Sequence, residues 1–324
     1  MQSIGIYCVL TVCRSPLTVF PSKIIVSNAP TPPDSGKRNS APKCADSGGE
    51  FAARFNNNAP PKLPGRGTAI FLGTGTSVGV PAIGCVCDVC TSEDPRNNRL
   101  RCAILVDLPK GLLLIDSPPD LRTQLLRERV RTIDAVLYTH EHADHIFGVD
   151  DLRLFPFRLG HAVPLYCQEK VEDRIRLSFD YAFIDRKETH PGSRPQLEFQ
   201  RIGHDPFELL GARITPIPMK HGPHFEVLGF RIGDFAYCTD TNEIPDASID
   251  LLQGVKTLVV GALREKPHAT HFNLEQATEI AQAIRPQQTY FTHVCHDLDH
   301  QRTCDYLPAG VDLAHDGLRV SVKL

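Results

Sequence analysis

A dense group of histidines and one aspartate lies in the segment YTHEHADHIFGVDDLR, residues 138–153. Within six positions it contains His140, His142, Asp144 and His145. Imidazole is the commonest metal ligand, and histidine combined with carboxylate oxygen suits Zn²⁺, Mn²⁺ or Fe²⁺. A purely structural explanation is disfavoured, because histidine is a sparse residue and three of them share this short segment. The segment therefore predicts part of a metal site, for which the rest of the chain must supply further ligands.

Metal-capable residues follow four separate apolar runs, which we predict to be β-strands. The runs and the residues at their ends are 135–139 with His140, 213–219 with His221, 235–240 with Asp240, and 289–293 with His293. The carboxyl ends of strands in an α/β sheet are where such folds usually bind ligands. The candidate ligands are thus seven: His140, His142, Asp144, His145, His221, Asp240 and His293. One catalytic metal keeps an open position, so seven ligands predict two metal ions that share a carboxylate.

Two metal ions held close together would give this site hydrolytic chemistry. At about 3.5–4 Å apart they can bind both the attacking and the leaving oxygen of an in-line displacement, and they lower the pKa of bound water toward neutral pH. We therefore expect hydrolysis of a phosphodiester or another ester. The expected cofactors are two divalent ions, zinc or manganese.

The composition is that of an ordinary globular protein. The 324 residues are 41% hydrophobic and 23% charged, with a net charge of −3. This weak negative charge gives no overall basic surface, so we do not expect nucleic acid as a partner. No apolar run reaches the 18 residues of a transmembrane helix, so we expect no membrane association. The 11 cysteines are an odd number without regular spacing and do not fit a disulfide framework.

The first 66 residues differ from the rest of the chain. Residues 1–33 contain no Asp or Glu, and residues 29–67 are rich in Pro, Asn, Gly and Ser. We expect a disordered extension over residues 1–66, because such a composition cannot bury a core. Acid-poor N-termini are typical of organellar transit peptides, so we expect a chloroplast or mitochondrial location, with the cytoplasm as the alternative. The apolar run Ile4–Cys13 suits a secretory signal but lacks a basic region before it, and an extension without targeting function is the third interpretation.

From residue 67 onward, apolar runs alternate with helix-like segments. The predicted strands are 68–73, 102–108, 111–116, 135–139, 213–219, 235–240, 257–262 and 289–293. The predicted helices are 120–130, 169–183 and 274–285, the last with Asn273 as N-cap and Pro286 just beyond its end. Mixed strands and helices with short connections predict one α/β sandwich domain over residues 67–324.

The pattern H-x-H-x-D-H, followed by a later His, Asp and His, resembles the metallo-β-lactamase fold over residues 67–324. The resemblance implies an αββα sandwich, in which two facing mixed sheets carry outer helices and the site lies at one edge. It also implies the following ligand division: His140, His142 and His221 on one metal, Asp144, His145 and His293 on the other, and Asp240 bridging. Asp144 then also belongs to the catalytic machinery. Asp116 matches the acidic residue behind the family's histidines, where it would orient an imidazole. An ordinary strand-end carboxylate is the alternative.

A second cluster, GCVCDVC, contains Cys85, Cys87 and Cys90. Three thiols within six residues suit a soft metal, and a Cys₃His tetrahedron would be a closed structural zinc site. We expect His296, in the segment THVCH, as the fourth ligand. The alternatives for this position are Cys102, Cys295 and His300. Three reduced thiols without a metal are the competing interpretation.

The cysteine cluster separates two branches of the family that the chain resembles. The tRNA 3′-processing ribonucleases share the LGTGTS-like and H-x-H-x-D-H elements, but their pattern has no such cysteine insert. We also find no Gly/Pro-rich arm that would hold tRNA. The cysteines, THVCH and HATHFNLEQA instead resemble the phosphoribosyl 1,2-cyclic phosphate phosphodiesterases of the carbon–phosphorus lyase pathway. This resemblance places His271 where that branch has a further active-site histidine, which we expect to protonate the leaving oxygen.

We therefore expect a metal-dependent phosphodiesterase that opens small cyclic phosphates, with a small-molecule phosphodiester as its partner. Arg153, just after the metal motif, is expected to bind the substrate phosphate, and an ion pair with an acid such as Asp150 is the alternative. The rival functions are a tRNA-processing endoribonuclease, a thioester or lactone hydrolase, and a non-catalytic metal-binding scaffold. The scaffold would need broken ligands, and none of the seven is missing. For the oligomeric state, the sequence allows a homodimer as well as a monomer.

Overall fold

The computed structural model describes residues 67–184, 190 and 192–324. The expected disordered extension and transit peptide at residues 1–66 lie outside the described residues. No helix in the described part of the chain is long and apolar enough to cross a membrane.

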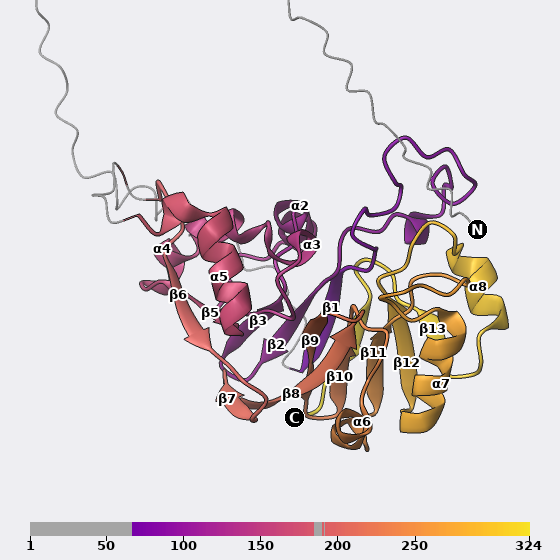
Figure 1. Ribbon diagram of the computed structural model, residues 1–324. Helices are drawn as coiled ribbons and strands as arrows, with labels where there is room; N and C mark the ends of the chain where they lie inside the picture. Colours follow the sequence, from indigo (N-terminus) through magenta and orange to yellow (C-terminus); the bar gives the residue numbers. More distant parts are fainter. Residues whose placement is uncertain (1–66, 185–189, 191) are drawn as a thin grey trace, which may run out of the picture. The chain divides into compact units, whose positions relative to one another are not determined.

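Two mixed β-sheets of seven strands face one another (Figure 1). The first, in the order β14-β1-β2-β3-β4-β5-β6, comprises β1 (Thr68–Gly73), β2 (Ala103–Leu108), β3 (Gly111–Ile115), β4 (Ala135–Leu137), β5 (Val163–Cys167), β6 (Leu197–Arg201) and β14 (Arg319–Ser321). The second, in the order β13-β12-β11-β10-β9-β8-β7, comprises β7 (Phe207–Leu209), β8 (Ala212–His221), β9 (Phe225–Ile232), β10 (Phe235–Cys238), β11 (Thr257–Gly261), β12 (Gln288–Thr292) and β13 (Val311–Leu313). Neighbours are parallel from β3 to β6 and from β10 to β13, and antiparallel elsewhere.

Helices cover the outer faces of both sheets. The α-helices are α2 (Leu121–Arg127), α3 (Ala143–Ile146), α4 (Pro156–Leu159), α5 (Glu169–Ser178), α6 (Asp246–Leu252), α7 (Leu274–Ile284) and α8 (His300–Tyr306). The 3₁₀-helices are η1 (Pro95–Asn97), η2 (Val149–Leu154) and η3 (Asp180–Ala182). In Figure 1, α2, α3 and α5 lie beside the first sheet, and α6, α7 and α8 beside the second.

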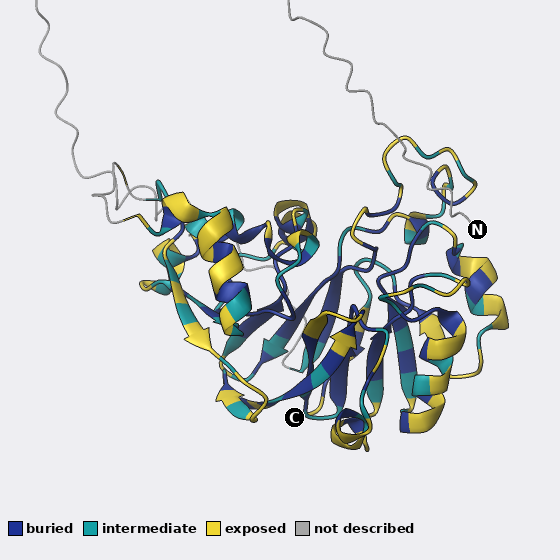
Figure 2. Ribbon diagram, in the orientation of Figure 1, coloured by how far each residue is buried: buried dark blue, intermediate teal, exposed yellow. Residues whose placement is uncertain are grey.

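Three hydrophobic layers hold this arrangement together. The middle layer joins the inner faces of the two sheets and contains, for example, Phe71, Leu113 and Phe230. A second layer packs α2, η2 and α5 onto the first sheet, and a third packs α6 and α7 onto the second. Figure 2 shows the strands mostly buried and the outward helix faces exposed. The predicted αββα sandwich is therefore confirmed.

Each predicted strand is present, with its ends shifted by at most two residues. The helix at 274–284 begins with the predicted cap: Asn273 Oδ1 accepts from Gln276 N (2.9 Å), and Gln276 Oε1 accepts from Asn273 N (3.1 Å). The predicted helix 169–183 is too long, because Phe179 leaves the helical conformation (φ −124°, ψ 42°) and α5 ends at Ser178.

The sequence analysis did not predict β9, whose run FEVLGFRI is interrupted by Gly229. Glycine is depleted in strands and often marks a close approach of another backbone. Here a Cβ at Gly229 would lie 2.8 Å from the carbonyl oxygen of Tyr237 on β10. The close approach of β10 therefore explains why a glycine occupies position 229, and this glycine is the reason that the strand was not predicted.

Candidate active site

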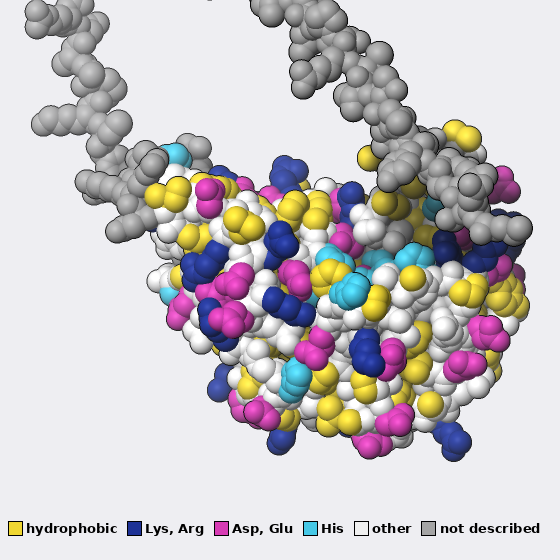
Figure 3. All heavy atoms as spheres, in the orientation of Figure 1, with side chains coloured by type: hydrophobic (Ala, Val, Ile, Leu, Met, Phe, Trp, Pro, Cys, Tyr) yellow, Lys and Arg dark blue, Asp and Glu magenta, His cyan; other side chains and the backbone are white. Residues whose placement is uncertain are grey.

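The strand topology brings the predicted ligands to one edge of the sandwich. β10, β11 and β12 are parallel, and β8 runs in the same direction because it and β10 are both antiparallel to β9. His221 is the last residue of β8, while Asp240 and His293 follow the ends of β10 and β12. Leu228 N on β9 donates to Thr139 O (3.0 Å), which joins the segment before His140 to this edge. Figure 3 shows several histidine side chains gathered on one face.

His140, His142 and His221 form the first ligand group, with one ligand atom from each within 4.8 Å of the others. His140 Nε2 lies 3.0 Å from His142 Nδ1. The remaining ring nitrogens of two members have oxygen partners: His140 Nδ1 bonds Thr139 Oγ1 (2.9 Å), and His221 Nδ1 donates to Thr270 O (2.7 Å). These partners direct the Nε2 atoms of His140 and His221 toward a shared position, as expected for metal-binding imidazoles.

Asp144, His145, Asp240 and His293 form the second group. His145 Nε2 lies 3.3 Å from both Asp144 Oδ2 and Asp240 Oδ2, and His293 Nε2 lies 3.1 Å from Asp240 Oδ1. His145 Nε2 and both ring nitrogens of His293 are buried without a hydrogen-bond partner in the described part of the chain. Buried imidazole nitrogens without partners are costly unless they bind something. They fit a metal ion at this position.

Asp240 faces both groups. Its Oδ2 points toward His145 and its Oδ1 toward His293, and the same carboxylate has an oxygen within 4.8 Å of a ring nitrogen of His221 and of His271. Thr239 Oγ1 donates to Oδ2 (2.6 Å), which helps to orient the carboxylate. The arrangement suits a carboxylate shared by two metal ions.

Asp116, at the end of β3, lies behind this second group. Its fully buried carboxylate accepts hydrogen bonds from His145 Nδ1 (2.8 Å), Thr139 N (2.9 Å) and Thr139 Oγ1 (2.9 Å). This placement matches the orienting role expected for Asp116. The sequence analysis did not select Thr139, although it directly precedes His140, because threonine at a strand end carries no chemical signal.

Three site residues adopt the left-handed backbone conformation. Their φ angles are 64° for Asp116, 55° for Asp240 and 57° for His293. Such values are uncommon outside glycine and cost about 1–3 kcal/mol each. All three occur where a strand ends, so the chain turns there to direct each side chain into the site.

The pKa shifts follow burial and the local charges. Burial lowers the pKa of His140 well below its usual range and lowers that of His221, which favours neutral, metal-binding imidazoles. Burial acts against ionisation of Asp240 too, but His293 and His145 hold its pKa well below the usual range. The pKa of His145 is raised despite burial, because Asp240, Asp144 and Asp116 surround it. The carboxylates of the second group therefore favour a cation among them, either a protonated His145 or a metal ion.

His271 lies between the two groups. Its ring centroid is 4.6 Å from that of His221 and 4.7 Å from that of His293, and its Nδ1 is 3.9 Å from Asp240 Oδ1. Burial and the neighbouring His293 lower its pKa to about 3. The imidazole is therefore neutral at neutral pH, so it can donate a hydrogen bond from one ring nitrogen but does not carry the extra proton that the expected general acid would transfer.

Cys85, Cys87, Cys90 and His296 lie together as the sequence predicts, with their ligand atoms within 4.8 Å. His296 Nδ1 is 3.2 Å from Cys85 Sγ and 3.4 Å from Cys87 Sγ. The Cys90 N–H and His296 lower the pKa of Cys87 to about 6, which favours the thiolate that zinc binds. The alternative fourth ligands have other contacts: Cys102 with Gly75 O, Cys295 with Asp297 N and His300 with Arg99.

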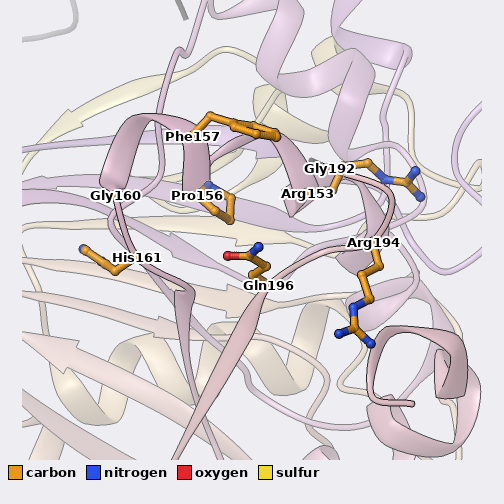
Figure 4. A pocket seen from close by; sticks show the side chains of 8 residues that line it. All are labelled: Arg153, Pro156, Phe157, Gly160, His161, Gly192, Arg194 and Gln196. Atoms are coloured by element: carbon orange, nitrogen blue, oxygen red, sulfur yellow. The ribbon is translucent and has the colours of Figure 1, made fainter. Parts of the chain in front are cut away.

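Arg153 does not join the metal-binding residues. It forms an ion pair with Asp150, and its Nε donates to Asp150 O (3.2 Å), which is the alternative that the sequence left open. Arg153 lines a separate pocket of about 160 Å³. Figure 4 shows the side chains that line it, among them Phe157 and Arg194. None of the seven candidate ligands lines that pocket.

Comparison with known proteins agrees with this geometry. The profile of the Beta-lactamase superfamily domain matches residues 112–294, more than half of the chain. A crystal structure of a new diphosphatase from the PhnP family is 46% identical, with a TM-score of 0.74, and the match covers 80% of this chain and 99% of that one. Zn²⁺-bound PqqB from Methylobacterium extorquens is 18% identical, with a TM-score of 0.63 and coverage of 79% and 100%, and shares the fold.

Another relative is longer than the segment over which it matches this chain. An octanoyltransferase of Porphyromonas gingivalis is 37% identical over 257 residues, which are 78% of this chain and 51% of that protein. The chain thus spans about half the length of this relative. The ligand groups, the αββα sandwich and the domain match together lead to one conclusion. The chain belongs to the β-lactamase superfamily and has the metallo-β-lactamase fold.

Proposed function

We propose that the protein is a phosphodiesterase that opens small cyclic phosphates of the phosphoribosyl type. The observation that carries this proposal is the pair of ligand groups around Asp240, with His271 between them. The 46% identity to a diphosphatase of the PhnP family supports chemistry at a phosphorus–oxygen bond. Negative charge develops on the phosphate oxygens in the transition state of a phosphoester cleavage. The two ligand groups would hold cations that stabilise this charge.

The two ligand groups would each hold one divalent ion, zinc or manganese, which when bound supplies hydroxide near neutral pH and stabilises negative charge. The residues of the chain supply the rest. Asp116 accepts from Nδ1 of His145 and so fixes the orientation of this imidazole. Asp144 and Asp240 place negative charge beside Nε2 of the same ring, where it would balance the charge of a bound cation. The neutral imidazole of His271 donates a hydrogen bond to the leaving oxygen, which develops charge as the phosphoester bond breaks.

A second candidate substrate is a diphosphate, because the 46% identical neighbour is described as a diphosphatase. Hydroxide attack on phosphorus would cleave either a cyclic phosphodiester or a diphosphate, so the reaction products must be identified to distinguish the two substrates. Ring opening of a cyclic phosphate gives one monoester, whereas cleavage of a diphosphate gives two products.

Acyl chemistry is the third candidate, since one relative is named as an octanoyltransferase. The match covers only 51% of that protein. An octanoyl thioester therefore belongs in the same assay as the phosphate substrates.

The test is a hydrolysis assay on full-length protein loaded with zinc or manganese. The substrates are a ribose 1,2-cyclic phosphate, a nucleoside diphosphate sugar, a precursor tRNA and an octanoyl thioester. We expect ring opening of the cyclic phosphate to be the fastest reaction and to disappear in Asp240→Ala, with Asp134→Asn as a control away from the ligands. Faster cleavage of the diphosphate, the tRNA or the thioester would replace the proposed activity with that one.

A further inference from the structure

His293 differs from the other buried histidines of the two ligand groups in how its ring is held. Those histidines each bond an oxygen atom through Nδ1: His140, His145 and His221. In His293, Nδ1 is buried without a hydrogen-bond partner in the described part of the chain. The ring instead stacks on that of His271, with centroids 4.7 Å apart and planes inclined by 16°. The backbone at position 293 must therefore set where this imidazole points.

The backbone at His293 is strained. Its φ of 57° lies in the left-handed region, and such a conformation persists only where the surrounding structure fixes the chain. Before this residue the chain is fixed by β12, which pairs with β11 and β13. After it, Val294 N donates to Thr74 O (3.0 Å), and Val294 O accepts from Thr76 N (3.1 Å). The position of His293 thus depends on the chain that follows it and on the chain that follows β1.

These same two parts of the chain meet again at the cysteine site. His296 lies three residues after His293, and its Nδ1 is 3.2 Å from Cys85 Sγ and 3.4 Å from Cys87 Sγ. The carbonyl of His296 also accepts from Cys87 Sγ (3.8 Å). Segment 293–296 therefore carries a ligand of the catalytic pair at one end and a ligand of the cysteine site at the other.

The loop that carries the cysteines has little apolar packing of its own. Val80 N donates to Arg99 O (2.9 Å) and Arg99 N to Val80 O (2.7 Å), which closes the base of the loop. At its tip, Ile83 is 100% exposed and Val86 85% exposed. Its hydrophobic cluster contains three buried residues, Val80, Val89 and Cys90. A loop with so small a core depends on bound metal for its structure, because metal binding supplies folding free energy.

We propose that metal bound at the cysteine site positions His293 for the second ligand group. The cysteine group shares no member with the other ligand groups, so its action on the catalytic ions is indirect. It passes through the backbone of segment 293–296, which makes His296 and the cysteines positioning residues. The inference concerns metal binding and applies to any substrate, so it does not rest on the proposed function.

The test changes the link at residue 296. His296→Ala removes the link and leaves the three thiols, whereas His296→Cys restores four ligands, since Cys₄ sites also hold structural zinc. Nδ1 is the ring nitrogen nearer to the backbone, so a cysteine sulfur reaches nearly the same point. Val171→Ala is the control for a general loss of stability, because Val171 is buried between α5 and the first sheet.

Each full-length protein is stripped of metal, given one zinc ion per chain, and titrated with Mn²⁺. Thiolates select zinc, whereas imidazole and carboxylate groups accept manganese, so Mn²⁺ reports on the catalytic pair. Electron paramagnetic resonance distinguishes one bound Mn²⁺ from a spin-coupled pair. In His296→Ala we expect the first ion to bind within about twofold of wild type and the second about 10–100-fold more weakly, the effect of losing an outer partner of a ligand. His296→Cys and Val171→Ala should keep the coupled pair.

Wild-type binding of both Mn²⁺ ions by His296→Ala, or equal weakening of both, would overturn the inference. Weakening of the same size in Val171→Ala would overturn it too, because loss of stability alone would then explain the result. If circular dichroism shows that His296→Ala does not fold, Cys87→Ser replaces it, and its second ion should bind only at higher Mn²⁺ concentration. Wild-type affinity in that variant would again refute the role. The titration uses no substrate, so its result is independent of the hydrolysis assay that tests the proposed function.

Discussion

Asp116→Asn should weaken metal binding more at the ligand group of His145 than at the ligand group of His140, because Asp116 bonds His145 directly and reaches His140 only through Thr139. The carboxylate of Asp116 accepts three hydrogen bonds, two from Thr139 and one from His145 Nδ1, all between 2.8 and 2.9 Å. An amide of the same shape has one acceptor and one donor atom. Asparagine also tolerates the left-handed backbone of position 116 (φ 64°), so the substitution changes hydrogen bonding more than conformation.

Either orientation of the new amide carries a cost. With its nitrogen toward His145, the imidazole must accept at Nδ1 and carry its proton on Nε2, the atom that faces Asp144 and Asp240. With its nitrogen toward Thr139 N, two donors meet in a buried place. Loss of such an orienting partner weakens metal affinity about 10–100-fold, equivalent to about 1.4–2.7 kcal/mol.

Competitive zinc titration with a fluorescent chelator measures this effect on both metal positions. We expect the larger loss at the group of Asp144, His145 and His293, and a smaller loss at the group of His140, His142 and His221, where Thr139 transmits the change to His140. Asp134→Asn is a matched control, because Asp134 also accepts from a backbone N–H, that of Leu112 (2.7 Å), but lies away from the ligands. Wild-type affinity at both positions, or a larger loss at the group of His140, would refute an orienting role of Asp116 toward His145.

Three further predictions concern the cysteine site, His271 and the N-terminal extension. Cys87→Ser should remove one tightly bound zinc ion and lower the unfolding temperature, while the catalytic metals can still be replaced; wild type purified with no zinc beyond the catalytic pair would contradict the site. His271→Ala should keep both metals but slow hydrolysis of a substrate with an alkoxide leaving group by about 10²–10³-fold, the cost of removing one hydrogen-bond donor to a developing oxyanion, with a smaller loss for a nitrophenyl ester. Equal losses on both substrates would contradict assistance to the leaving oxygen. We propose organellar targeting, so residues 1–66 fused to a fluorescent protein should enter a chloroplast or mitochondrion, and diffuse fluorescence would reject this.

Local sequence determined the types of ligand and the elements that carry them. Strand ends can be located from apolar runs because a buried strand must stop where polar residues begin, so His140, His221, Asp240 and His293 were found without a structure. The N-cap of α7 was equally predictable, because Asn273 and Gln276 interact within one turn of the chain.

Tertiary structure decided every feature that depends on residues far apart in the chain. His296 meets Cys87 across 209 positions, and only the fold could select it over Cys102, Cys295 and His300. The same holds for Thr139, whose residue type carries no catalytic signal and whose role comes from its contact with Asp116. The ion pair of Arg153 with Asp150 is local, but sequence alone could not choose between it and a phosphate contact. Asp150 and Arg153 lie on the same 3₁₀-helix, η2, so their pairing is set locally, whereas a phosphate contact depends on where η2 lies relative to the ligand groups, which only the tertiary structure decides.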